Sequence, residues 1–188
     1  MRLAAPRIAP LNDDELTDDQ REALAPMRTG GRAPLNIFRT LARAPKALAR
    51  FNEWGSYVLS RRNSLPARER EIVILRVGFL CKSGYEFTQH TRIGLSEGLT
   101  ADEIANIKAG ADAGWSPADA ALIRAADELV TGHFVSDATW AALSEHFDEK
   151  QRMDVVFTAG QYTQVSMFLN TFGVQLDAGQ TLDPDLRA

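Results

Sequence analysis

A glutamate and a histidine four residues apart are the first pair in the chain that could perform acid/base chemistry. Glu86 and His90 share one face of any helix that contains both, because side chains at positions i and i+4 are neighbours there. A carboxylate beside an imidazole can hold the ring in one tautomer and raise the pKa of the histidine, as a general acid or base requires. The same spacing is common on solvated helices, so a surface ion pair is the alternative.

Other polar residues near this pair could bind a ligand or serve only the fold. Tyr85 could donate a hydrogen bond to a substrate or fill the core. Tyr162 and Gln161 form a polar pair in an apolar segment and need partners if they are buried, so they are candidates to line a pocket. Ser83 could contact a substrate or cap the helix that carries Glu86, and Glu86 could complete a capping box with it.

The segment before this pair adds three candidates. Glu71 could take part in catalysis or could simply stabilise the positive end of a helix dipole. Arg76 could bind a substrate carboxylate, although an ion pair with Glu69 or Glu71 is the preferred interpretation. Cys81 is the single cysteine of the chain, so no disulfide, cysteine-based zinc cluster or two-cysteine redox pair can form within it. We expect it to pack as a small hydrophobic residue.

Helix signals surround all of these residues and predict an all-α fold. Thr17, Thr100 and Ser136 are the expected N-caps, Glu103 can complete a capping box with Thr100, and Gly30-Gly31 is an expected break. With the prolines and the apolar spacing, these signals predict helices at 17–26, 35–43, 45–60, from 66 onward, 83–98, 100–108, from 117 onward, 140–147 and 149–172. The β-branched run 72–74 would also suit a buried strand, but nothing else in the chain alternates or suggests a βαβ unit. The apolar positions of the third of these helices predict a core face that consists of Leu48, Phe51, Trp54, Tyr57 and Val58.

Composition places the chain among small soluble proteins. Its 188 residues suit one domain, and 45% hydrophobic and 24% charged residues are ordinary globular values. The net charge of −4 comes without a basic stripe, so nucleic acid is not expected as a partner. Residues 155–176 lack charge, but glycines and polar side chains interrupt them, which favours a core or subunit-interface helix over a membrane span. The lone cysteine and the absence of a signal-like apolar run in residues 1–12 predict a cytoplasmic protein.

Several stretches of the sequence resemble the carboxymuconolactone decarboxylase family. They are NIFRTLAR at 36–43, LPAREREIVILR at 65–76, YEFTQH at 85–90, and the segment 160–174, which begins with GQY and ends with NTFGV. The likeness covers most of residues 34–176 and is most specific in residues 65–98. We therefore divide the chain into an N-terminal arm with a short helix (1–32), a family-like helical domain (33–176) and a C-terminal surface tail (177–188).

The wider superfamily, which includes alkylhydroperoxidase D-like (AhpD-like) proteins, carries a Glu-x11-Cys-x2-Cys-x3-His pattern. Without gaps, this pattern places Glu71 on the glutamate and His90 on the histidine, whereas Ser83 and Glu86 occupy the two cysteine positions. Thiol peroxidase activity is therefore disfavoured. The replacement resembles the decarboxylase-like branch, with Phe87 where tryptophan is commoner.

This resemblance implies a compact helical fold, self-association as a trimer or hexamer, and a site near a subunit boundary. It also implies a cofactor-independent carboxy-lyase that acts on a small carboxylated lactone or a related intermediate of aromatic-compound catabolism. Glu71, Glu86 and His90 are the expected catalytic residues, with His90 as proton donor, and Arg76, Ser83, Tyr85 and Tyr162 are the candidates for substrate binding. The alternative is a non-catalytic or regulatory oligomer that binds a small molecule. A metal held by the three catalytic candidates is disfavoured, because three ligands that include only one histidine are few for a metal site.

Overall fold

The computed structural model describes residues 3–28 and 33–187, which form helices joined by loops. In chain order the α-helices are α1 (Asp18–Leu24), α2 (Asn36–Leu41), α3 (Pro45–Leu59), α4 (Ala67–Leu80), α5 (Gly84–Ser96), α6 (Ala101–Ala109), α7 (Pro117–Gly132), α8 (Asp137–Ser144) and α9 (Glu149–Phe172). Short 3-10 turns lie at Asp13–Glu15, Ala25–Met27 and Pro184–Leu186. No residue in the two described ranges lies in a strand, so the all-α prediction is confirmed.

Most helices begin where their capping residues predicted. The hydroxyls of Thr17, Thr100 and Ser136 each accept a hydrogen bond from a backbone N–H in the first turn of α1, α6 and α8. Thr100 also forms the predicted reciprocal capping box with Glu103. The predicted break at Gly30-Gly31 lies outside the described residues.

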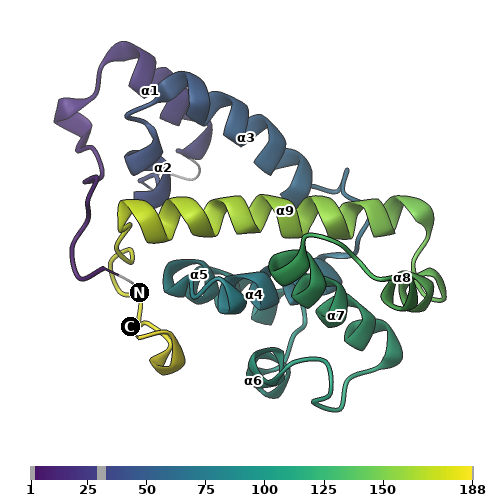
Figure 1. The fold of residues 1–188 in the computed structure, drawn as a ribbon. Helices are drawn as coiled ribbons and strands as arrows, with labels where there is room; N and C mark the ends of the chain where they lie inside the picture. The colour runs from purple at the N-terminus through teal and green to yellow at the C-terminus, as the bar shows by residue number, and fades with distance from the viewer. Residues whose placement is uncertain (1–2, 29–32, 188) are drawn as a thin grey trace.

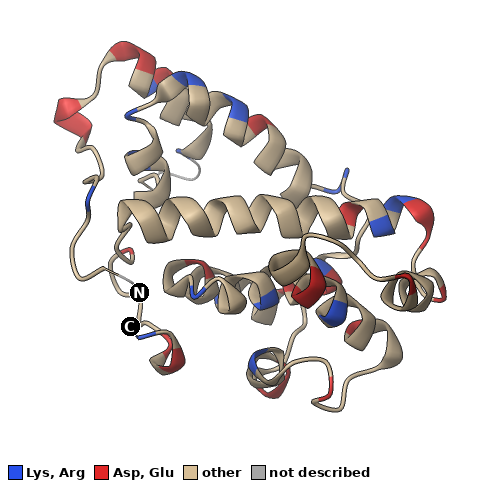
Figure 2. Cartoon of the chain, in the orientation of Figure 1, with Lys and Arg blue, Asp and Glu red and all other residues tan. Residues whose placement is uncertain are grey.

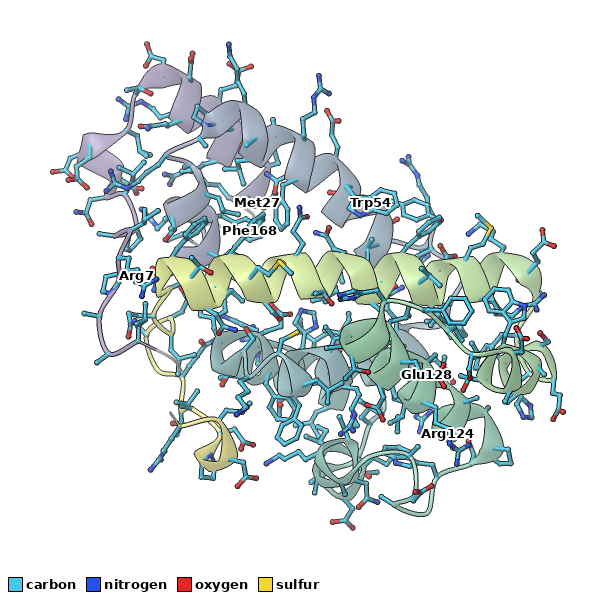
Figure 3. The ribbon with its side chains drawn as sticks, in the orientation of Figure 1. Arg7, Met27, Trp54, Arg124, Glu128 and Phe168 are labelled. Atoms are coloured by element: carbon cyan, nitrogen blue, oxygen red, sulfur yellow. The ribbon has the colours of Figure 1, made fainter. Side chains whose placement is uncertain are left out.

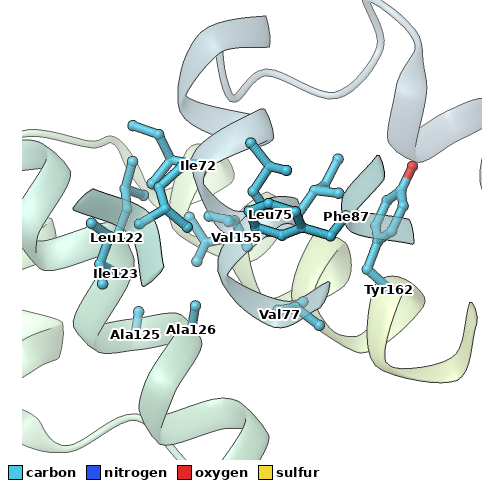
Figure 4. Packing of buried hydrophobic residues seen from close by; sticks show 14 of the residues in the cluster. Ile72, Leu75, Val77, Phe87, Leu122, Ile123, Ala125, Ala126, Val155 and Tyr162 are labelled. Carbon is cyan, nitrogen blue, oxygen red and sulfur yellow. The ribbon is translucent and has the colours of Figure 1, made fainter. Parts of the chain in front are cut away.

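The long helix α9 divides the molecule (Figure 1). Helices α1 to α3 lie on one side of it, and α4 to α8 lie on the other. Helix α4 packs against α5, α7 and α9, and its stretch from Ile72 to Leu75 has no solvent exposure. Figure 4 shows Ile72, Leu75 and Val77 among side chains from α5, α7 and α9. The apolar sequence of α4 is thus explained by its central position.

Helix α9 is charged only at its start (Figure 2). Beyond Asp154, one side of the helix packs on the core while Val156 and Met167 remain exposed. The predicted use of this uncharged helix at a subunit interface stays a prediction. Within the described residues, none of the helices is long and apolar enough to cross a membrane.

One prediction about α3 is wrong. Leu48 and Val58 are buried as expected, but Trp54 is 41% exposed. Its ring stacks on Tyr57 and meets the edge of Phe157, both at centroid distances of 5.4 Å, so it covers the outer seam between α3 and α9 (Figure 3). The spacing of apolar residues identified the helix face, but the width of the contact with α9 decides which of them are buried.

Both ends of the chain attach to the helical body. The backbone N–H groups of Arg7 and Ile8 donate to the carbonyl of Phe172 at 2.9 and 3.1 Å. The segment after α9 is bound more closely than a surface tail, since Asp177 accepts hydrogen bonds from side chains of α5 and Leu186 is buried.

Candidate functional site

Glu71, His90 and Glu86 form a continuous buried contact between α4 and α5. His90 Nδ1 lies 2.7 Å from Glu71 Oε2. On the other side of the ring, His90 Nε2 lies 3.0 Å from Glu86 Oε1, although the alignment is not that of a hydrogen bond. The three residues are 1%, 6% and 3% exposed, respectively. The structure therefore places the three catalytic candidates together, in the order carboxylate, imidazole, carboxylate.

Two glycines allow α4 and α5 to approach closely enough for this contact. A Cβ atom on Gly78 of α4 would lie 3.4 Å from Glu86 Cγ, so the Glu86 side chain packs directly against the α4 backbone. A Cβ atom on Gly94 of α5 would lie 3.7 Å from the Cβ of Glu71 and 2.9 Å from Leu99 Cδ1. Small residues at both contact points thus set the distance between the two helices.

Burial and mutual charge together raise the pKa values of both Glu86 and His90. Burial raises the pKa of Glu86 to about 7, and the Glu71 carboxylate adds to the rise while His90 opposes it. Burial tends to lower the pKa of His90, but the Glu71 and Glu86 carboxylates outweigh it and the pKa is raised. The Glu86 carboxyl can therefore carry a proton near neutral pH.

A cavity of about 360 Å³ opens beside this group. Glu86 and His90 line it from α5, and Asn52, Gln161 and Arg92 are further polar lining residues. Its apolar wall consists of Met27, Leu35, Ile37, Phe38, Phe51, Leu59, Ile93 and Val165. Figure 3 labels Met27, which reaches toward this region from the chain before α2. A mostly apolar hollow with a few polar groups is typical of small-molecule sites.

The two tyrosine candidates both line the cavity. The ring of Tyr162 meets the His90 ring edge-on at a centroid distance of 4.9 Å, and burial raises the pKa of Tyr162 well above its ordinary value. Figure 4 shows Tyr162 at one end of the core cluster. The hydroxyl of Tyr85 donates to Asp177 at 2.5 Å, so this tyrosine is held by the C-terminal segment.

Two other candidates lie away from the cavity. Ser83 precedes α5 as predicted, but its hydroxyl makes no capping bond and has no hydrogen-bond partner among the described residues. The predicted capping box with Glu86 is therefore wrong, because the Glu86 carboxylate turns toward His90.

Arg76 is structural. Its Nε donates to Asp127 and its Nη1 donates to the carbonyls of Ile107 and Lys108 at 2.7 and 3.0 Å. The expected structural ion pair exists, but its partner is Asp127 on α7, not a glutamate on its own helix. These contacts tie α4 to α6 and α7, and Arg76 does not line the cavity.

Several residues that the sequence did not single out belong to this region. Asn52 and Arg92 line the cavity. Arg92 lies on α5 only two residues beyond His90, and this closeness in the sequence could have identified it as a candidate. Arg70, next to Glu71, is 9% exposed, and its charge opposes the rise in the pKa of His90. In residues 3–28 and 33–187 no group of three or more His, Cys, Asp or Glu side chains is arranged to hold a metal ion.

The fold and the site together define an all-helical protein with a buried carboxylate–imidazole–carboxylate group at a small cavity. The model of the carboxymuconolactone decarboxylase family matches residues 45–128, which contain Glu71, Glu86 and His90. No curated protein matches the sequence.

Solved structures share the fold at low sequence identity. An uncharacterized peroxidase-related protein from Ralstonia eutropha JMP134 with an alkylhydroperoxidase AhpD core has a TM-score of 0.78 at 20% identity, over 93% of this chain and 95% of that one. A putative antioxidant defence protein AhpD of unknown function from Agrobacterium tumefaciens has a TM-score of 0.68 at 16% identity, over 73% and 95%. A Cys→Ala variant of the debrominase Bmp8, bound to 2,3,4-tribromopyrrole, has a TM-score of 0.70 at 11% identity, over 93% and 94%. Residues 45–128 thus resemble the carboxymuconolactone decarboxylase family, and the chain shares its fold with AhpD-like proteins.

Proposed function

We propose that this protein is a cofactor-independent, decarboxylase-like lyase that acts on a small carboxylated lactone or a related intermediate of aromatic-compound catabolism. The observation that carries the proposal is the buried Glu71–His90–Glu86 contact beside a mostly apolar cavity. Two carboxylates around one imidazole provide both a proton store and a means of orienting the ring.

Decarboxylation of such a substrate requires little from the protein beyond proton transfer. The bond between the substrate carbon and its carboxylate breaks, carbon dioxide leaves, and the electron pair passes to the conjugated lactone carbonyl as a dienolate. The protein must then hold the carboxylate in a poorly solvated place and supply one proton to the correct carbon. The apolar lining of the cavity and the adjacent acid group fit both tasks.

The geometry favours Glu86 over His90 as the group that meets the substrate. Both ring nitrogens of His90 face carboxylates, whereas Glu86 lines the cavity and its carboxyl has an oxygen, Oε1, without a hydrogen-bond partner among the described residues. Glu86 would give its proton to the dienolate carbon, and His90 would reprotonate Glu86. Glu71 accepts a hydrogen bond from Nδ1–H and thereby stabilises the imidazolium, whose Nε2 proton passes to Glu86 and leaves a neutral ring protonated at Nδ1.

A carboxylated substrate also needs a cation at the cavity, and Arg92 replaces Arg76 in this role. Among the residues that line the cavity, Arg92 is the only lysine or arginine. It is exposed, and its side chain has no ion pair or hydrogen bond within the described part of the chain. Its guanidinium is therefore available to form a bidentate contact with a carboxylate.

Thiol chemistry has less support than acid/base chemistry. The chain has one cysteine, and Cys81 does not line the cavity. The similar fold of the peroxidase-related proteins and of the debrominase therefore supports a small-molecule site in this chain without supporting their reactions.

The proposal is tested by turnover of 4-carboxymuconolactone by purified, metal-stripped protein, followed by ultraviolet absorbance and mass analysis. We expect the wild type to release carbon dioxide and the His90→Ala variant to lose at least a hundredfold in rate. Lack of turnover by well-folded wild type would reject this substrate and favour the alternative, a protein that binds a small molecule without converting it.

A further inference from the structure

Two amide side chains that line the cavity have no part in the proton path. Asn52 Nδ2 and Gln161 Oε1 are both buried, and neither atom has a hydrogen-bond partner among the described residues. Buried polar atoms are nearly always paired in folded proteins, so two unpaired ones on the same cavity indicate that something else binds there.

The two amides lie close together on one wall of the cavity. Asn52 and Gly55 are one turn apart on α3 and therefore share a helix face. Gln161 comes from α9, and its Nε2 lies 3.6 Å from the position that a Cβ atom of Gly55 would occupy. The missing side chain of Gly55 thus leaves room for the Gln161 amide within a helical turn of Asn52.

Asn52 and the acid group line the same cavity from different helices. Asn52 comes from α3 and Glu86 from α5, and these helices lie on opposite sides of α9 (Figure 1). A ligand in the cavity therefore meets the Glu86 carboxyl at one side and the two amides at the other.

We propose that Asn52 and Gln161 bind a hydroxyl group of the ligand. A hydroxyl accepts one hydrogen bond and donates one, so it satisfies the N–H of Asn52 and the carbonyl oxygen of Gln161 at once. An ether or a ketone can only accept and would leave Gln161 Oε1 unpaired. The ligand class is then a small ring compound with a hydroxyl group for the amides and a carboxylate for Arg92. This inference rests on the proposed function in that it takes the same cavity as the substrate site.

The test compares two probes that differ only in this group, 4-hydroxybenzoate and 4-methylbenzoate, by calorimetric titration of the full chain. We expect the wild type to bind the hydroxylated probe at least tenfold more tightly. The variants Gln161→Leu and Asn52→Leu should reduce this ratio to about twofold or less without weakening 4-methylbenzoate.

A matched control separates this role from the general cost of an unpaired polar group. Thr40 has a buried hydroxyl without a partner among the described residues, but it does not line the cavity. Both Thr40→Val and Gln161→Leu should raise the melting temperature of the ligand-free protein by about 2–4 °C, but only Gln161→Leu should change the ratio of probe affinities.

Equal affinities of the wild type for the two probes would overturn the inference and would mean that water satisfies the amides. A ratio that survives Gln161→Leu, or no saturable binding of 4-hydroxybenzoate, would also overturn it. Neither probe is turned over by the proposed lactone chemistry, so the ratio is independent of the decarboxylation assay. A hydroxyl preference without decarboxylation would leave this inference standing and reject the proposed function.

Discussion

Nδ1 of His90 lies 2.7 Å from Oε2 of Glu71, and both side chains are almost completely buried. The contact joins helices α4 and α5 across the turn that follows Leu80. The other ring nitrogen, Nε2, lies 3.0 Å from Oε1 of Glu86.

Replacing Glu71 with glutamine should lower the pKa of His90. The negative charge of Glu71 raises that pKa, and an uncharged amide at the same place removes the effect while burial continues to oppose protonation. Nuclear magnetic resonance titration of the His90 ring would measure the change. Glu69→Gln on the same helix is the control, because Glu69 pairs with Arg68, and it should leave the His90 pKa in place. An unchanged pKa in Glu71→Gln would contradict the assigned contact.

Replacing Glu86 with glutamine should flatten the dependence of stability on pH. The pKa of Glu86 is raised from 4.5 to about 7 in the folded protein, so its contribution to the free energy of unfolding is fully present below pH 4.5 and is lost as pH rises toward 7. The loss is on the order of 3 kcal/mol for a shift of this size. Chemical unfolding of wild type and Glu86→Gln between pH 5 and 8 should therefore diverge, with the variant relatively more stable at pH 8. Parallel curves would contradict the raised pKa.

Arg76→Gln should lower the stability of the protein, whereas Arg92→Gln should weaken substrate binding. Arg76 is 8% exposed and holds Asp127 and two backbone carbonyls, so its loss should cost about 2–4 kcal/mol of stability. Arg92 is exposed and unpaired among the described residues, so its loss should leave the melting temperature nearly unchanged. With a carboxylated substrate, Arg92→Gln should raise KM about tenfold or more. Thermal melting together with steady-state kinetics distinguishes the two, and a stable Arg76 variant with a raised KM would reverse the assignment.

Gly173→Ala should loosen the N-terminal arm. Gly173 ends α9 with φ of +70°, and an added Cβ atom would lie 2.9 Å from the backbone oxygen of Ala5. The strained backbone and this clash together should cost about 2 kcal/mol or more. Melting and the rate of proteolysis within residues 3–12 would measure the effect. Gly179→Ala is the control, since it shares a positive φ of +80° but meets no atom within 4 Å, and it should cost less and leave the arm protected.

The local features of this protein could be read from its sequence. Thr17, Thr100 and Ser136 cap the helices that they were expected to cap, because a cap depends only on residues a few positions away. The apolar residues of α4 agree with its central place, since a helix that is apolar on most sides can be stable only when it is surrounded. Glu86 and His90 were paired by helical spacing alone, which is also a local relation.

The tertiary structure decided what depends on partners far apart in the chain. Arg76 binds Asp127 and Tyr85 binds Asp177, and no spacing rule reaches across 51 or 92 residues. Glu86 was equally suited to a capping box, and only the position of His90 beside Glu71 of another helix turns its carboxyl inward. Gln161 was already a candidate to line a pocket, but Asn52 became one only when α3 and α9 brought the two amides to one cavity. The physical reason is that a side chain's charge state and partners depend on what is buried around it, and burial is a property of the packed chain.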